Sequence, residues 1–263
     1  MNISYSELIL LNNAVIDNVD RLIEAGTDRI ELMMDGASWD SYNGDFSALV
    51  RELRARDVEY SVHPAAWDIN LAAETEILRD AAYDHHCQAM HFAAEIGASQ
   101  VVLHPGFVGS PCFSKETSKR RAKEATQRLA KDAKALGLKL AFENVGYNGQ
   151  SIYTEEEYVT ALDDVDPVVG YLIDIGHAHL NGWNIPQMIE RVSHRLLGLH
   201  IHDNSGKYDE HLPIYCGTVP WEDVFRAMKE NCRSDCEYIL EYVPGTHLDA
   251  LTSGKRVLLE KLV

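Results

Sequence analysis

Six residues that can bind a divalent metal ion stand at the ends of successive apolar segments of the sequence. Each segment is short and rich in aliphatic residues, which is typical of a buried strand. Imidazole and carboxylate groups are the ligands that zinc, manganese and related ions accept. The six residues are His63, His104, Glu143, Asp174, His200 and Glu241. Their recurrence at strand ends predicts that they gather at one place.

The same segments contain few cations that could neutralise these carboxylates. Lys139 opens one segment and Arg195 precedes another, both at the end opposite to the candidate ligands. Carboxylates that gather without cations repel one another, and an uncompensated buried charge costs several kcal/mol. We therefore predict a bound divalent ion. The alternative is an ordinary polar layer in which each carboxylate pairs with an Arg or a backbone amide.

Alternating short apolar runs and longer amphipathic stretches indicate repeated βα units around a parallel sheet. We expect eight strands, over residues 2–8, 29–34, 58–63, 100–105, 139–145, 169–177, 196–203 and 237–243. Helices are expected between them, among others over residues 14–25, 46–56, 71–96, 221–231 and 247–262. Eight units without a second-domain signal predict one α/β domain over residues 1–263, a single (β/α)8 TIM barrel. In such a barrel the carboxyl ends of the strands form one active site.

Composition and charge restrict the partners. The chain has 41 acidic and 24 basic residues and a formal net charge of -17. This charge repels polyanions, which argues against nucleic acid as a partner. The start of the chain lacks the features of a signal peptide and no apolar run is long enough for a membrane span, so we expect a cytoplasmic protein that does not bind membranes. Five scattered cysteines are expected to be reduced thiols.

Three further residues are candidate ligands for a second or third ion. His177 follows Asp174 by three positions, and Asp209 and His211 form an Asp-x-His pair after the seventh strand. His202 points to the same face of its strand as His200 and competes with it for the ligand role. The remaining histidines are expected to be structural.

These motifs resemble the xylose-isomerase-like barrels, a superfamily of sugar isomerases, ketose 3-epimerases and endonuclease IV. The resemblance covers nearly the whole chain. It is carried by Val-Leu-His104-Pro-Gly, Phe-Glu143-Asn-Val, Ile-Asp174-Ile-Gly-His177, Leu-His200-Ile-His-Asp203-Asn, Asp209-Glu-His211-Leu-Pro and Ile-Leu-Glu241-Tyr.

The resemblance implies one ion or several. In the epimerases and isomerases a single ion is held by four residues, which correspond here to Glu143, Asp174, His200 and Glu241. Endonuclease IV holds two more ions. The remaining ligands of its set correspond to residues of the same types here, namely His63, His104, His177, Asp209 and His211. The ligand pattern alone therefore does not separate sugar chemistry from phosphodiester chemistry.

The amino-terminal third of the chain favours sugar chemistry. The first strand lacks the Gly-x-His-x-Ser-x-x-Gly-Gly pattern of endonuclease IV, whereas Gly-Thr-Asp-Arg-Ile-Glu31-Leu resembles a pattern common among sugar isomerases. The loop over residues 35–45 holds three aspartates and no Lys or Arg, although a loop that enters DNA should be basic. Trp39 and Tyr42 in this loop suit an aromatic wall for a sugar ring.

The leading hypothesis is a metal-dependent isomerase or epimerase that acts on a small sugar or sugar phosphate. A divalent ion would stabilise an enediolate intermediate. Manganese and zinc are the leading candidates for this ion, and cobalt and magnesium are the alternatives. Glu143 and Glu241 would form the acid–base pair on opposite sides of the reacting carbon. The resemblance implies His177 and Glu31 as substrate contacts, and Trp39 is a further candidate for contact with the sugar.

Two alternatives stay open. The first is a metal-dependent phosphodiesterase of the endonuclease IV type, an AP endonuclease, and the second is a binding protein without catalysis. The sequence does not identify the sugar or show whether it is phosphorylated; Lys207 is one candidate contact for a phosphate. The oligomeric state is also open, and a homo-oligomer is one possibility.

Overall fold

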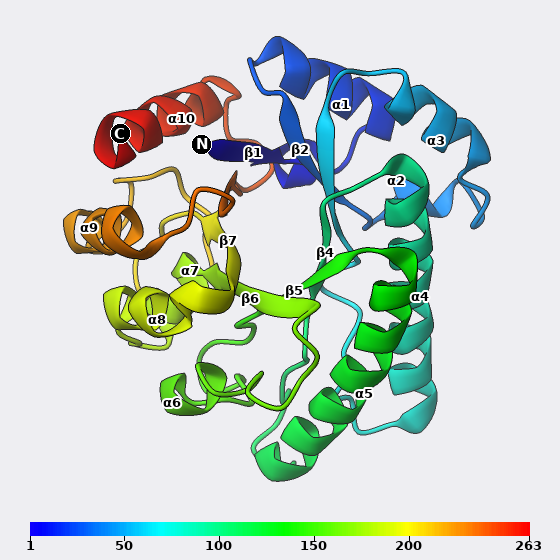
Figure 1. The fold of residues 1–263 in the computed structure, drawn as a ribbon, viewed down its shortest axis with the longest axis vertical. Helices are drawn as coiled ribbons and strands as arrows, with labels where there is room; N and C mark the ends of the chain where they lie inside the picture. The colour runs from blue at the N-terminus through cyan, green and yellow to red at the C-terminus, as the bar shows by residue number, and fades with distance from the viewer.

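The chain forms a closed barrel of eight parallel strands, β1 to β8, in chain order (Figure 1). The structure is a computed structural model that describes residues 1–263. The strands are β1 Asn2–Ser6, β2 Arg29–Met33, β3 Glu59–His63, β4 Gln100–Leu103, β5 Lys139–Glu143, β6 Val169–Asp174, β7 Leu196–Ile201 and β8 Glu237–Leu240. The predicted (β/α)8 barrel is confirmed.

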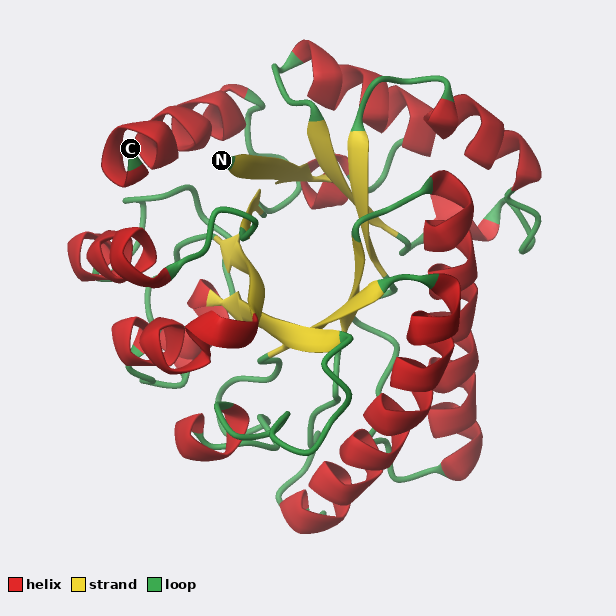
Figure 2. Cartoon of the chain, in the orientation of Figure 1, coloured by secondary structure: helices red, strands yellow, loops and turns green.

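A ring of helices surrounds the strands (Figure 2). The helices are α1 Val15–Glu24, α2 Ala37–Asp40, α3 Ser47–Arg54, α4 Glu76–Ile96, α5 Lys115–Leu136, α6 Glu155–Tyr158, α7 Ile175–Leu180, α8 Ile185–Val192, α9 Trp221–Asn231 and α10 Asp249–Leu262. The helix after β5, α6, has only one turn, whereas α4 and α5 are the longest. None of the helices combines the length and the hydrophobicity that a membrane span requires.

Most strands end earlier than the sequence indicates. The largest differences are three residues: β6, expected to reach residue 177, ends at Asp174, and β8, expected to reach residue 243, ends at Leu240. The Asp174 carboxylate accepts a hydrogen bond from the His177 amide at 2.6 Å and so caps α7. An aspartate at this position favours the start of a helix over a continued strand. His177 therefore projects from a helix.

The barrel interior has an apolar layer directly beneath the candidate ligands. Side chains two residues apart on a strand point to the same face, so the residues two positions before His104, Glu143, Asp174 and Glu241 share their side of the sheet. They form a separate buried cluster of Val102, Ala141, Leu172 and Ile239. A larger core of 60 residues lies between the strands and the helices. The two apolar layers hold the strand ends at fixed positions.

Candidate metal centre

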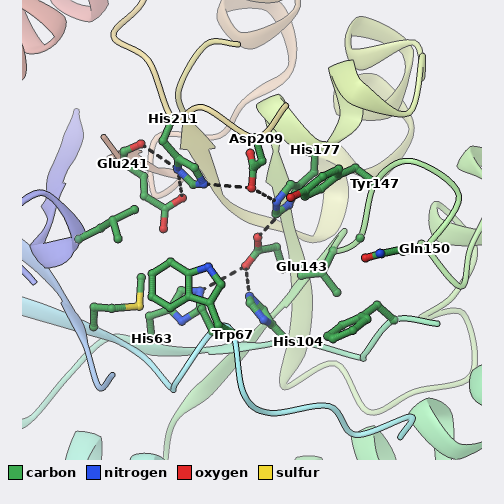
Figure 3. A pocket seen from close by; sticks show the side chains of 16 residues that line it. His63, Trp67, His104, Glu143, Tyr147, Gln150, His177, Asp209, His211 and Glu241 are labelled. Atoms are coloured by element: carbon green, nitrogen blue, oxygen red, sulfur yellow. Dashed lines mark hydrogen bonds and ion pairs between the residues drawn. The ribbon is translucent and has the colours of Figure 1, made fainter. Parts of the chain in front are cut away.

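Glu143 lies at the middle of a cluster of imidazoles and carboxylates at the carboxyl ends of the strands (Figure 3). Its Oε1 lies 3.5 Å from Nδ1 of His200 and 3.5 Å from Nδ1 of His177. Its Oε2 lies 2.9 Å from Nε2 of His104 and 3.6 Å from Nε2 of His63. Burial alone would raise the pKa of Glu143, but the His104 and His200 imidazoles hold that pKa well below its usual value. Each carboxylate oxygen thus faces a different group of histidines.

The first group, named here the central site, consists of Glu143, Asp174, His200 and Glu241. Nδ1 of His200 lies 3.5 Å from Glu143 Oε1, 3.7 Å from Asp174 Oδ2 and 3.5 Å from Glu241 Oε2. Ligands of an ion bound at about 2.1 Å stand about 3.0 to 3.4 Å apart in octahedral and tetrahedral geometry. The observed separations exceed these by only a few tenths of an ångström. Nδ1 of His200 therefore lies within ligand range of three carboxylates. The trios whose ligand atoms all lie within 4.8 Å of one another include Glu143, Asp174 and His177, and His63, Glu143 and His200.

The second group contains His63 and His104 beside Oε2 of Glu143. Nδ1 of His63 lies 2.6 Å from the Pro64 carbonyl oxygen. That oxygen can only accept a hydrogen bond, so Nδ1 carries the hydrogen and Nε2 presents its lone pair to Glu143. In the neutral ring this lone pair faces a carboxylate, and either a proton or a metal ion between them relieves the repulsion. This group can hold a second ion.

The third group contains His177, Asp209 and His211. Nε2 of His177 lies 3.1 Å from Asp209 Oδ2, and Nε2 of His211 lies 3.2 Å from the same oxygen. Burial disfavours the charged imidazole, but the Asp209 and Glu241 carboxylates raise the pKa of His211 to about 9. The same kind of pairing raises the pKa of His177 well above its usual value. This part of the site thus favours bound positive charge.

Several buried polar atoms of the cluster have no hydrogen-bond partner in the chain, and they test whether an ion fits. They include His200 Nδ1, His177 Nδ1 and Asp209 Oδ1. Native proteins pair nearly all such atoms, and an unpaired one costs about 1 to 3 kcal/mol. The cavity lining includes no Lys or Arg that could pair with the carboxylates. A divalent cation fits both the charge and the donor set.

The sequence left the choice between His200 and His202 open. His202 Nε2 lies 3.1 and 3.0 Å from the two oxygens of Asp174, and its ring stacks on His211 at 3.8 Å between centroids. The structure thus places His200, and not His202, among three carboxylates. Asn144 binds the backbone of Asp174 through both its amide atoms, at 3.0 and 2.8 Å. His202 contacts the Asp174 carboxylate and Asn144 its backbone, and His202 also forms a candidate ligand group with His211 and Glu241.

Two expected substrate contacts lie away from the cavity. Glu31 is fully buried, at 0% exposure, and its carboxylate contacts Nε2 of His200. Trp39 packs in an aromatic cluster with Tyr42, Phe46 and Phe92. Neither residue belongs to the lining of this cavity, and a substrate contact by either one stays a prediction.

The cavity above the cluster has a volume of about 190 Å³ and an aromatic wall that the sequence analysis missed. Trp67, Phe107, Tyr147 and Gln150 line it together with Glu143, His177 and Glu241 (Figure 3). Tyr147 stacks on His177 with ring centroids 5.9 Å apart. These residues follow β3, β4 and β5, in loops. The sequence feature that could have indicated these wall residues is an aromatic residue a few positions after a strand end.

Barrel and cluster together define a (β/α)8 protein with a candidate divalent-metal centre at the carboxyl ends of its strands. Residues 19–258 match the family described as xylose isomerase-like TIM barrel, and the chain belongs to this family.

A protein of Methanocaldococcus jannaschii is similar to this chain over most of the chain's length. The uncharacterized protein MJ1311 of Methanocaldococcus jannaschii is 28% identical over 238 residues, which cover 88% of this chain and 80% of that protein. A probable endonuclease 4 of Thermoplasma volcanium is 27% identical over 137 residues, covering 52% of this chain and 46% of that protein.

Solved structures share the whole fold. A D-tagatose 3-epimerase-like protein has a TM-score of 0.84 at 23% identity, covering 100% of this chain and 97% of that one. IolI protein with a bound zinc atom has a TM-score of 0.83 at 21% identity, covering 100% and 98%. Endonuclease IV from Thermus thermophilus has a TM-score of 0.72 at 19% identity, covering 100% and 99%. At these identities the similarity concerns the fold.

Proposed function

We propose that this protein is a metal-dependent isomerase or epimerase that acts on a small sugar or sugar phosphate. The observation that carries the proposal is the position of Glu143 and Glu241. Both carboxylates lie 3.5 Å from Nδ1 of His200, and both line the same cavity. They come from β5 and from the end of β8, so they approach the cavity from different sides of the barrel. Two carboxylates in this arrangement suit proton transfer on opposite faces of one carbon.

Glu241 is the candidate for removing the proton from the carbon next to the carbonyl. Its Oε2 faces His200 and, at 3.5 Å, Nδ1 of His211. These contacts fall on one oxygen, which leaves Oε1 for the substrate. Glu143 would act on the opposite face of the same carbon, with Nε2 of His104 2.9 Å from its Oε2.

Glu143, Asp174, His200 and Glu241 would hold the ion. When bound, a divalent ion supplies positive charge that stabilises negative charge on substrate oxygens. The aromatic wall of Trp67, Phe107 and Tyr147 suits the apolar face of a sugar ring. The neighbours that are named as 3-epimerases and the zinc-bound IolI support this choice of chemistry by analogy.

Exchange of a carbon-bound hydrogen tests the proposal. Metal-replete protein incubated with free and phosphorylated ketoses in deuterium oxide should place deuterium at the carbon next to the carbonyl. Glu241→Gln, assayed with its metal content verified, should lower that rate by roughly a hundredfold or more. Glu237→Gln is the control, because Glu237 is a buried carboxylate at the start of β8, the strand that Glu241 follows, and does not line the cavity. Absence of exchange across the panel, while abasic-site DNA is cut in the same buffer, would contradict the proposal.

A phosphoester hydrolase of the endonuclease IV type is the second candidate, and one observation favours it. The groups around His63 and His104 and around Asp209 add two possible ion positions to the central site. Clustered ions are typical of phosphoester hydrolysis. The net charge of -17 and a lining without Lys or Arg argue against a DNA substrate.

A further inference from the structure

Glu31 and His200 contact each other across the barrel interior. Oε1 of Glu31 lies 3.2 Å from Nε2 of His200, and Oε2 lies 3.4 Å from it. Both side chains are completely buried, at 0% exposure. Glu31 is on β2 and His200 on β7, which are not adjacent strands, so sheet pairing does not impose the contact.

This contact determines which nitrogen of His200 carries the hydrogen. A carboxylate can only accept hydrogen bonds, so Nε2 is the donor to Glu31. In the neutral imidazole Nδ1 is then an acceptor, and it faces Glu143, Asp174 and Glu241 at 3.5 to 3.7 Å. In the other tautomer the lone pair of Nε2 would face the Glu31 carboxylate, which is repulsive.

We propose that Glu31 is a positioning residue that holds His200 with Nδ1 directed at the metal ion. The proposal rests on the proposed metal centre and adds a role for a residue outside the ligand set. Carboxylates that bind the outer nitrogen of a metal-binding histidine typically change metal affinity by about 10- to 100-fold. An effect of this size is expected here because the contact is fully buried.

Metal affinity, and not stability, separates this role from a merely structural one. In the metal-free protein the His200 imidazole, 3.2 Å from Glu31, can hold a proton that neutralises the buried carboxylate, so removal of Glu31 can change stability in either role. Glu31→Leu should weaken metal binding whatever its effect on the stability of the metal-free protein. Substitution of a purely structural residue would leave metal affinity unchanged.

Zinc affinity of the full chain, measured by competition with a fluorescent chelator, tests the proposal. Glu31→Leu should bind zinc about 10- to 100-fold more weakly than the wild type. Glu31→Gln keeps an acceptor oxygen and should lose less than about tenfold. Glu237→Gln, which removes another buried carboxylate of the barrel interior, should bind like the wild type. Affinity of Glu31→Leu within threefold of the wild type, or an equal loss in Glu237→Gln, would overturn the role of Glu31. A wild type that binds no zinc would overturn the metal centre itself.

Nitrogen NMR of the zinc-loaded protein gives a second, independent measurement. With histidines labelled with nitrogen-15, and His200 assigned by comparison with His200→Gln, the His200 signals should show the hydrogen on Nε2 and zinc on Nδ1. In Glu31→Leu the nitrogen-15 shift of Nε2 should change, because its hydrogen loses the Glu31 acceptor. Zinc on Nε2 of His200 in the wild type would overturn the proposal.

Discussion

Glu237, at the amino end of β8, is a buried carboxyl whose titration should be visible in the stability of the protein. It is 6% exposed, the Ser4 hydroxyl donates to its Oε1, and the Gln100 amide donates to its Oε2 at 3.0 Å. Burial raises the pKa of Glu237 from 4.5 to about 7 in the folded protein. In the unfolded chain the pKa returns to about 4.5.

The sign follows from proton binding. Between pH 4.5 and pH 7 the unfolded chain loses this proton first, so rising pH favours unfolding. Integration from pH 5 to pH 8 gives a loss of about 2.5 kcal/mol from this one group. Glu237→Gln has no proton to lose, and its amide can still accept from Gln100 and donate to Ser4. Relative to the wild type, the variant should therefore gain about 2.5 kcal/mol over the same pH range.

Urea unfolding of metal-free wild type and Glu237→Gln at pH 5 and pH 8 measures this difference. Groups that titrate in both proteins, including the candidate metal ligands, cancel in the comparison. Chelator in every sample keeps metal binding out of the result. A difference between the two proteins that stays constant within about 0.5 kcal/mol across the range would refute a neutral Glu237 in the folded barrel.

Three further predictions concern the cluster and its cavity. Wild-type protein expressed with ample metal should carry at least one ion per chain, and Asp174→Ala less than about a tenth of an ion, by elemental analysis. Titration of metal-free protein with zinc should show a tight step and a weaker one, and His211→Ala should remove only the weaker step; a single step unchanged by this substitution would contradict a second ion. Trp67 is 57% exposed and lines the cavity, so Trp67→Ala should change unfolding free energy by less than about 0.5 kcal/mol while it raises the KM of the exchange reaction several-fold.

The arrangement of the strand ends could be predicted because two simple periodicities determine it. Alternation along a strand gives the face, and the parallel barrel gives the common end, so His104, Glu143 and His200 were expected to converge. The layer of the barrel interior in which each inward-pointing side chain lies was harder to predict. Glu31 lies two residues before the end of β2, whereas Met33 at that end lines the cavity. Glu31 therefore points into the barrel one layer below Met33, which lines the cavity.

Residues in loops could not be placed, because loop conformation follows no period in the sequence. Trp39 faces Phe92, a residue of α4 more than fifty positions away, and the contact depends on how α4 packs against the β2 loop. Trp67 and Tyr147 reach the cavity from two different loops. Only their closeness to strand ends marked them in advance. The roles of the cavity residues in binding and catalysis stay predictions.

The two oxygens of Glu143 connect the number of ions to the reaction. With one ion in the central site, Oε1 faces that ion and Oε2 faces His104, at 2.9 Å, where it can exchange a proton. With a second ion between His63 and His104, Oε2 becomes a ligand as well, and Glu143 can no longer act as an acid or base. An empty position between His63 and His104 therefore favours carbon-acid chemistry, and an ion at that position favours phosphoester hydrolysis. Since both reactions need Glu143, its substitution alone cannot distinguish them, and the ion count must accompany every activity assay.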